Sequence, residues 1–242
     1  MLTTDLKPEN AYLRVLLLGQ PGTGKSTMAS TFPKPYFFDF DNKMLGLAGV
    51  PDILYDVFSD EGDVPKAWNA FIDKLRSLIA APGDRQTIVL DSFTALQEIG
   101  LNEVQRVNNT YGKPVSLKEW GILSGMLNDV LYMLKGVKNL HVVVTAHEEI
   151  VKDDERGMTY IMPVAMGKIS ATLPAFFHEV YRCRTRRTSH GVEYYIVTKA
   201  LDNAPGNTIL RGLGTEEVPN YKSIIAKDKA WREKEVTKNG IY

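Results

Sequence analysis

Short apolar runs alternate with amphipathic or polar stretches along much of the chain. Each apolar run stops at a polar or turn-forming residue, which predicts buried strands over 13–18, 36–40, 87–90 and 140–145. Apolar residues at helical spacing, or bounding Pro and Gly residues, predict helices over 25–32, 65–81, 92–107 and 117–134. Alternation of strands and helices is typical of an α/β fold with a mostly parallel central sheet.

The pattern changes beyond Phe176, where polar and apolar positions alternate. Strands over 179–187 and 192–198 flank the turn-like residues 188–191 and predict an antiparallel hairpin. Loops are expected over 46–65 and 147–163, and only weak elements after Pro205. The chain shows no internal repeat and no obvious linker. We therefore predict a single domain over 1–242, with a core over about 12–200 and a C-terminal extension over about 201–242.

Composition narrows the class of protein. Among 242 residues, 29 Lys and Arg balance 29 Asp and Glu, and 44% of the residues are hydrophobic. These values exclude a disordered chain and a protein that binds nucleic acid by its bulk charge. The lone Cys183 excludes a disulfide framework and a multi-cysteine zinc site, and it is expected to be buried and inert. The chain shows no membrane span and no signal peptide, so we expect a cytoplasmic protein.

The segment GQPGTGKST at 19–27 carries the strongest chemical signal. Its first part fits the phosphate-loop pattern G-x-x-x-x-G-K-[ST] without a mismatch, after an apolar strand and before a helix. Glycines let backbone N–H groups face a phosphate, and the helix start offers further N–H groups. Lys25 is expected to reach the β- and γ-phosphates, and Ser26 to bind Mg²⁺. The predicted nucleotide-binding residues are Gly19, Gln20, Pro21, Gly22, Thr23, Gly24, Lys25, Ser26 and Thr27.

A second acidic signal follows the strand TIVL at 87–90. The strand ends in Asp91, which is the Walker B arrangement. A carboxylate at the carboxyl edge of the sheet lies beside the phosphate loop, so Asp91 is predicted to hold Mg²⁺ with Ser26. The alternative is an Asp that caps the next helix. The residue after Asp91 is Ser92 and not a second acid, so a hydrolase would need its base elsewhere.

Three strand ends together resemble the RecA-type recombinase core: YFFDFD at 36–41, TIVLDSFTAL at 87–96 and VVVTAH at 142–147. This resemblance implies a RecA-like P-loop NTPase in which Asp41 activates water, Asp91 holds the metal and His147 senses the γ-phosphate. Asp41 and His147 depart from RecA itself, which has Glu and Gln there. Asp39 and Asp41 alternate, so both are expected on one strand face, beside the phosphate-loop strand. The alternatives are a helix cap or solvated loop for Asp41, and a polar strand terminator for His147.

A narrower group shares several of these features. The phosphate loop, Phe32-Pro33, the D-x-D strand end, Ala-His and GKISATLPAFFHEVYR at 167–182 resemble phage AAA-type proteins, including the Sak group of single-strand annealing proteins. The resemblance implies a DNA-dependent ATPase that uses ATP and Mg²⁺, binds single-stranded DNA and promotes annealing in phage recombination, in the host cytoplasm. It further implies a homo-oligomer with ATP at the subunit interface, and a single-strand binding protein as partner. Lys199 resembles the cation donated in trans, with Arg211 as second choice.

Candidate DNA contacts fall in three places. The connector at 105–118 combines cations with polar and aromatic side chains, a composition that suits single-stranded nucleic acid. The segment 148–165 is acidic and unfavourable for phosphate, with only one lysine just beyond it. Alternating arginines at 182–186 lie on one strand face and predict a DNA track, a subunit interface or a solvated face. The candidates are Arg106, Lys113, Lys118, Lys168, Arg182, Arg184 and Arg186.

Two other functions stay open. The neutral charge and the acidic 148–165 segment favour a nucleotide-dependent switch or partner-binding module without DNA activity. A small-molecule kinase is the third alternative, but the chain shows no clear Arg-rich lid for the phosphate site.

Overall fold

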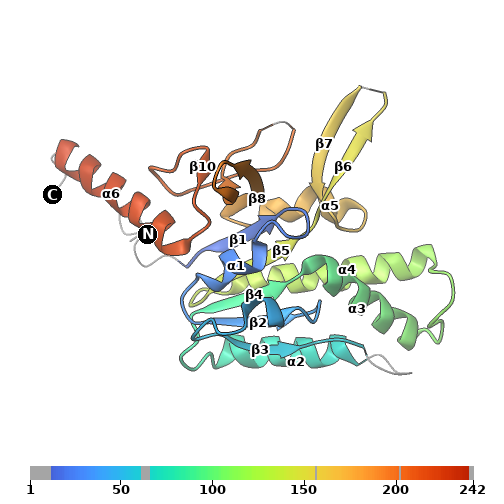
Figure 1. Ribbon diagram of the computed structural model, residues 1–242. Coiled ribbons are helices and arrows are strands. Elements are labelled where there is room, and N and C mark those ends of the chain that lie inside the picture. Colours follow the sequence, from blue (N-terminus) through green and yellow to red (C-terminus); the bar gives the residue numbers. More distant parts are fainter. Residues whose placement is uncertain (1–11, 61–65, 156, 202, 240–242) are drawn as a thin grey trace.

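A computed structural model describes residues 12–60, 66–155, 157–201 and 203–239 of the chain. An eight-stranded sheet runs through the middle of the molecule, in the order β10-β9-β8-β1-β5-β4-β2-β3 (Figure 1). The six strands from β8 to β3 are mutually parallel, whereas β9 and β10 run antiparallel at one edge. The strands are β1 (Arg14–Leu18), β2 (Pro35–Asp39), β3 (Leu54–Val57), β4 (Thr87–Asp91), β5 (His141–Ala146), β8 (Glu179–Thr188), β9 (Gly191–Val197) and β10 (Glu216–Glu217).

Helices follow most of the parallel strands, as the sequence predicts for a right-handed α/β arrangement. The α-helices are α1 (Lys25–Ser30), α2 (Ala67–Ala80), α3 (Phe93–Val107), α4 (Leu117–Gly136), α5 (Lys168–Thr172) and α6 (Tyr221–Asn239). Two short 3₁₀ helices are η3 (Met44–Leu47) and η4 (Leu173–Phe176). Ser92 caps α3 and a Ser116–Glu119 capping box starts α4, which fixes where both helices begin.

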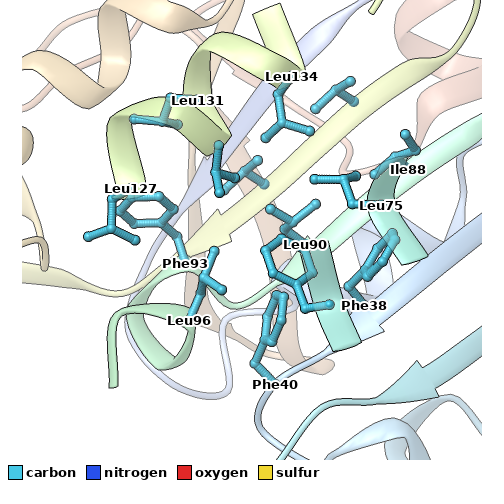
Figure 2. Close-up of a cluster of buried hydrophobic side chains, with 14 of the residues drawn as sticks. Phe38, Phe40, Leu75, Ile88, Leu90, Phe93, Leu96, Leu127, Leu131 and Leu134 are labelled. Carbon is cyan, nitrogen blue, oxygen red and sulfur yellow. The ribbon is translucent and has the colours of Figure 1, made fainter. Parts of the chain in front are cut away.

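The central strands are apolar on both faces because helices or loops cover each face. On one face, sheet residues such as Phe38 and Leu90 pack against α2, α3 and α4, through residues that include Leu75, Leu127 and Leu131 (Figure 2). On the other face, α1, η3 and the C-terminal segment cover a second cluster that includes Met28 and Ile224. This two-sided burial explains why the strands appear in the sequence as continuous apolar runs.

Three elements differ from the sequence-based expectation. Residues 147–163, predicted as a loop, form a two-stranded hairpin of β6 (Glu148–Asp153) and β7 (Met158–Pro163) that projects from the body (Figure 1). Strand β3 lies within the predicted loop 46–65, and the 19-residue helix α6 lies in the tail expected to be weak. The hairpin is largely exposed, and α6 is polar on most of its surface, so neither shows a periodic apolar face.

Within the described ranges, no helix has the length and apolar character that a membrane crossing needs.

Candidate functional site

The phosphate loop connects β1 to α1 at the carboxyl edge of the sheet, where parallel strands present ligands. Gly22 and Gly24 adopt the left-handed region, with φ of 80° and 84°, which other residues rarely reach. A Cβ on Gly22 would meet no atom within 4 Å, so this part of the loop faces open space. A Cβ on Gly19 would come within 2.6 Å of the Cys183 carbonyl oxygen, so the loop also needs glycine for close packing. Cys183 is buried, as expected, and burial raises the pKa of its thiol to about 12.

Lys25 folds back under its own loop. Its ammonium group donates to the carbonyl oxygens of Gly19 (2.8 Å) and Gln20 (3.0 Å) and lies 3.5 Å from Nδ1 of His147. The side chain is buried, and desolvation lowers its pKa, although the carboxylates of Asp91, Glu148 and Asp41 favour the charged form. A buried cation whose hydrogen-bond partners are neutral groups is well placed to move to a phosphate oxygen.

Asp91 ends β4, and β5 lies between β4 and β1, the strand that leads into the phosphate loop. The Thr145 hydroxyl, on the adjacent strand β5, donates to Oδ1 of Asp91 at 2.5 Å and fixes its orientation. Asp91 and Ser26 line the same cavity and offer one carboxylate and one hydroxyl. These two oxygen ligands fit a Mg²⁺ ion whose other ligands are phosphate oxygens and water. Among the described residues, no group of three or more His, Cys, Asp or Glu is placed to hold a metal ion. A metal ion at this site would therefore need phosphate oxygens among its ligands. The Asp91–Ser92 peptide bond is cis.

The strand that leads to Asp41 is not where the sequence reasoning placed it. Strand β2 lies beyond β4 and β5, not beside β1, so the predicted neighbourhood is wrong. The strand ends at Asp39, whose buried carboxylate accepts backbone N–H groups from Asp41, Lys43 and Met44. Asp39 and Asp41 therefore do not share one strand face: Asp39 holds the loop, and Asp41 extends from that loop into the cavity.

His147 follows β5, and β5 lies between β1 and β4, so the predicted position of the sensor strand beside the Walker B strand is confirmed. The His147 backbone N–H donates to the Thr94 hydroxyl of α3 at 3.0 Å. Burial, followed by the nearby Lys25 charge, lowers the pKa of the His147 imidazole, so the ring is neutral at neutral pH. Because an ammonium group only donates, the 3.5 Å contact between Lys25 and Nδ1 is a hydrogen bond only in the tautomer whose Nδ1 lacks a proton.

These groups meet in a cavity of about 650 Å³. Its walls combine phosphate-loop residues with acidic and basic side chains from other elements. The lining residues are Pro21, Gly22, Gly24, Lys25, Ser26, Thr27, Met28, Asp41, Lys43, Asp91, Ser92, His147, Tyr194 and Pro219. The volume suits a nucleotide-sized ligand.

Sequence reasoning missed several residues of the site. Thr145 and Thr94 support Asp91 and His147, and Tyr194 and Pro219 form a wall of the cavity. The sequence places both threonines near motif residues, but only the sheet order shows that they face them. Tyr194 and Pro219 carry no motif and come from distant segments, so no sequence signal could have identified them.

The alternating arginines of β8 are paired within the molecule. Arg182 and Arg184 donate to the two oxygens of Glu148 at 3.1 and 3.0 Å, with Arg182 and Glu148 only 4% and 5% exposed. Arg186 pairs with Glu193 and Glu216. Thr185, which alternates along β8 with the buried Tyr181 and Cys183, is exposed. These ion pairs compensate the charge that a DNA track on β8 would use, and its DNA role stays a prediction.

The other predicted DNA residues lie on or beside three different helices. Arg106 pairs with the buried carboxylate of Glu103, whereas Lys113, Lys118 and Lys168 are exposed. Lys113 and Lys118 flank the start of α4, and Lys168 begins α5.

Lys199, the predicted trans cation, follows β9. It is exposed and does not line the cavity of its own subunit, so its role at a neighbouring site stays a prediction. The second choice, Arg211, lies with its guanidinium 5.8 Å from the ring centroid of Trp231.

Comparisons with known proteins give a family for the chain. Two similar solved structures are a KaiC-like protein from Pyrococcus horikoshii OT3 (12% identity, TM-score 0.44, covering 79% of this chain and 80% of that one) and the flagellar accessory protein FlaH from Methanocaldococcus jannaschii (12% identity, TM-score 0.39, covering 86% and 84%). No curated protein matches the sequence. The model of the AAA_24 family, described as an AAA domain, matches residues 11–221. With its phosphate loop on a mostly parallel α/β sheet, the chain is a P-loop NTPase that belongs to the AAA_24 family.

Proposed function

We propose that the protein binds ATP with Mg²⁺ and hydrolyses it. The observation that carries the proposal is the cavity in which the phosphate loop, Asp91 and Asp41 meet. Membership of an AAA-domain family supports nucleotide binding. Asp91 ends β4 and Asp41 lies in the loop after β2, and this separation supports different roles for them, one at the metal and one at the attacking water.

The phosphate loop supplies binding. The backbone N–H groups of the loop and of the first turn of α1 would surround the β-phosphate, and Lys25 would leave the Gly19 and Gln20 carbonyls for a phosphate oxygen. Ser26 and Asp91 would hold Mg²⁺, which when bound neutralises charge on the phosphates. The Thr145 hydroxyl keeps the Asp91 carboxylate oriented for this task.

Asp41 and His147 would act at the γ-phosphate end. Asp41 lines the cavity, and its charge acts on both Lys25 and His147, so it lies where a water-orienting carboxylate is needed. An N–H of the neutral His147 ring would donate to a γ-phosphate oxygen once Lys25 has moved. Glu148 follows His147 directly and begins β6, so the same segment connects the γ-phosphate to the projecting hairpin.

Two variants test this assignment. Lys25→Ala should reduce ATP affinity at least tenfold, because the cation is removed from the phosphates, whereas Lys34→Ala, an exposed lysine paired with Asp84, should leave it unchanged. Asp41→Asn should retain ATP affinity and lower the hydrolysis rate roughly 10²- to 10⁴-fold, the range for loss of a general base. Calorimetry and phosphate release measure the two quantities. Full activity in Asp41→Asn would contradict the role of Asp41.

Single-stranded DNA is the partner we propose for this ATPase, with annealing of phage DNA strands as the activity. The observation in favour is that Lys113, Lys118 and Lys168 are exposed and that no described carboxylate pairs with them. A protein that contacts phosphates loses affinity steeply as salt rises. We expect labelled single strands to bind at low salt and to dissociate with a steep salt slope, and the triple change of these lysines to Glu should abolish binding. No binding at low salt would leave the alternative, a nucleotide-dependent switch that acts on a protein partner.

A further inference from the structure

The cavity has two chemically different ends. Lys25, Asp41, Asp91 and His147 supply charge and hydrogen bonds at one end. Beyond the phosphate loop, the same cavity is also lined by an aromatic ring and a proline ring, Tyr194 and Pro219. We propose that Tyr194 and Pro219 form the subsite for the nucleobase, and that it recognises a purine ring by stacking. This inference rests on the proposed binding of a nucleoside triphosphate at the charged end.

Tyr194 is held in place although its ring is solvent-exposed. It belongs to β9, where it pairs with Thr185 of β8, and 47% of its surface is exposed. Its ring lies so near the phosphate loop that a Cβ on Gly24 would come within 3.1 Å of it. The next residue, Tyr195, points the other way and lies under the Arg186 guanidinium, 4.7 Å from the ring centroid. A fixed, exposed aromatic ring beside a phosphate loop has the position that a stacking partner for a base requires.

Pro219 reaches the same wall from the segment between β10 and α6. The residues that follow Pro219 hold it in position. The Tyr221 backbone N–H donates to the Thr31 hydroxyl at the end of α1 at 2.9 Å. The Asn220 backbone N–H also donates to the Val218 carbonyl at 2.8 Å, which closes a tight turn around the proline. Helix α1, which begins within the phosphate loop, therefore carries at its far end the contact that positions Pro219.

This wall is poor in groups that read the edge of a base. Discrimination between bases needs well-placed donors and acceptors, and a site without them cannot strongly reject one purine in favour of another. Tyr194, Pro219 and Met28 offer ring faces and apolar surface, and neither a carboxylate nor an amide. Stacking depends on ring area, so we expect ATP and GTP to bind with similar affinity and pyrimidine nucleotides to bind more weakly.

Comparison of ATP with inorganic tripolyphosphate isolates the contribution of the base. By calorimetry, Tyr194→Ala should weaken ATP and GTP binding roughly 5- to 150-fold, the range for loss of one stacking partner, and should leave tripolyphosphate affinity unchanged. Tyr194→Phe keeps the ring and should retain ATP affinity. Tyr55→Ala, which removes a similarly exposed tyrosine outside the cavity, is the matched control. Equal unfolding midpoints of all variants show that each one folds.

The outcomes separate the two proposals. If Tyr194→Ala weakens tripolyphosphate as much as ATP, Tyr194 supports the loop and does not bind a base, and the inference is overturned. If ATP affinity does not change, or if wild-type protein binds ATP no more tightly than tripolyphosphate, the base subsite is overturned while the phosphate site stands. If wild-type protein binds neither ligand, the proposed function fails and the base subsite fails with it.

Discussion

Asp39 and Asp41 lie two positions apart, but one carboxylate is buried in the protein and the other faces the cavity. The Asp39 carboxylate is buried and bound to three backbone N–H groups, and the loop that it holds carries Asp41 into the cavity. Sequence reasoning placed Lys25 at a helix start, and Asp91 and His147 at strand ends, because their motifs are local. It could not separate the roles of two acids at one strand end, because burial and loop direction depend on the strands beside them.

Replacement of Asp39 by Ala should lower the free energy of unfolding by about 2–4 kcal/mol, because three backbone N–H groups lose their acceptor. The loop would also lose the contacts that hold Asp41, so ATP hydrolysis should fall while ATP binding is retained. Asp39→Asn keeps one acceptor oxygen and should lose less stability. Urea unfolding and phosphate release measure both effects, and wild-type values in Asp39→Ala would show that the loop is held by other contacts.

At the scale of elements, strands and helices with a periodic or continuous apolar pattern were predicted to within a few residues. The exceptions are β3, the β6–β7 hairpin and α6, whose residues are largely exposed. Helix α6 is attached by few apolar side chains, mainly Ile224 in the cluster on the second face of the sheet. A helix of this kind has no amphipathic signal, because tertiary contacts at one end determine its position.

Ile224→Ala should therefore cost about 2–5 kcal/mol of stability, as expected for truncation of a buried isoleucine. The same truncation at Ile150, exposed on β6, is the matched control and should change stability by less than about 0.5 kcal/mol. Chemical denaturation followed by tryptophan fluorescence reports both variants. An Ile224→Ala protein as stable as the control would mean that α6 does not pack on the sheet.

At the scale of the whole molecule, distant segments meet around His141 at the start of β5. Its Nδ1 accepts the Leu13 backbone N–H at 3.0 Å, its Nε2 lies 3.2 Å from the Tyr221 hydroxyl, and the Phe32 ring packs against it. The ring thus joins β5, the segment before β1, and α6. Sequence reasoning predicted the parallel sheet but not this junction, because no motif relates residues so far apart along the chain.

Burial at this junction lowers the pKa of His141 from 6.5 to about 4, which gives stability a defined pH dependence. Between these two values the unfolded chain binds the proton more tightly, so the free energy of unfolding falls as pH falls. The loss attributable to His141 is about 2 kcal/mol at pH 5 relative to pH 7.5, and levels off below about pH 4. Urea unfolding across this pH range should show that the free energy of unfolding depends clearly less on pH in His141→Gln than in the wild-type protein. Burial also lowers the pKa values of His147 and His178, and both residues contribute equally to the pH dependence of the wild-type protein and of the variant.

Glu148 is where the projecting hairpin is joined to the rest of the protein. Its carboxylate binds Arg182 and Arg184, and its carbonyl oxygen accepts from the Gln20 amide at 2.8 Å. Beyond this root, β7 is held through Asn203. The tip of the hairpin can therefore change in length and sequence without disturbing the phosphate loop. The hairpin is therefore an exchangeable module: a new recognition sequence can be grafted at its tip while the phosphate-loop domain stays the same.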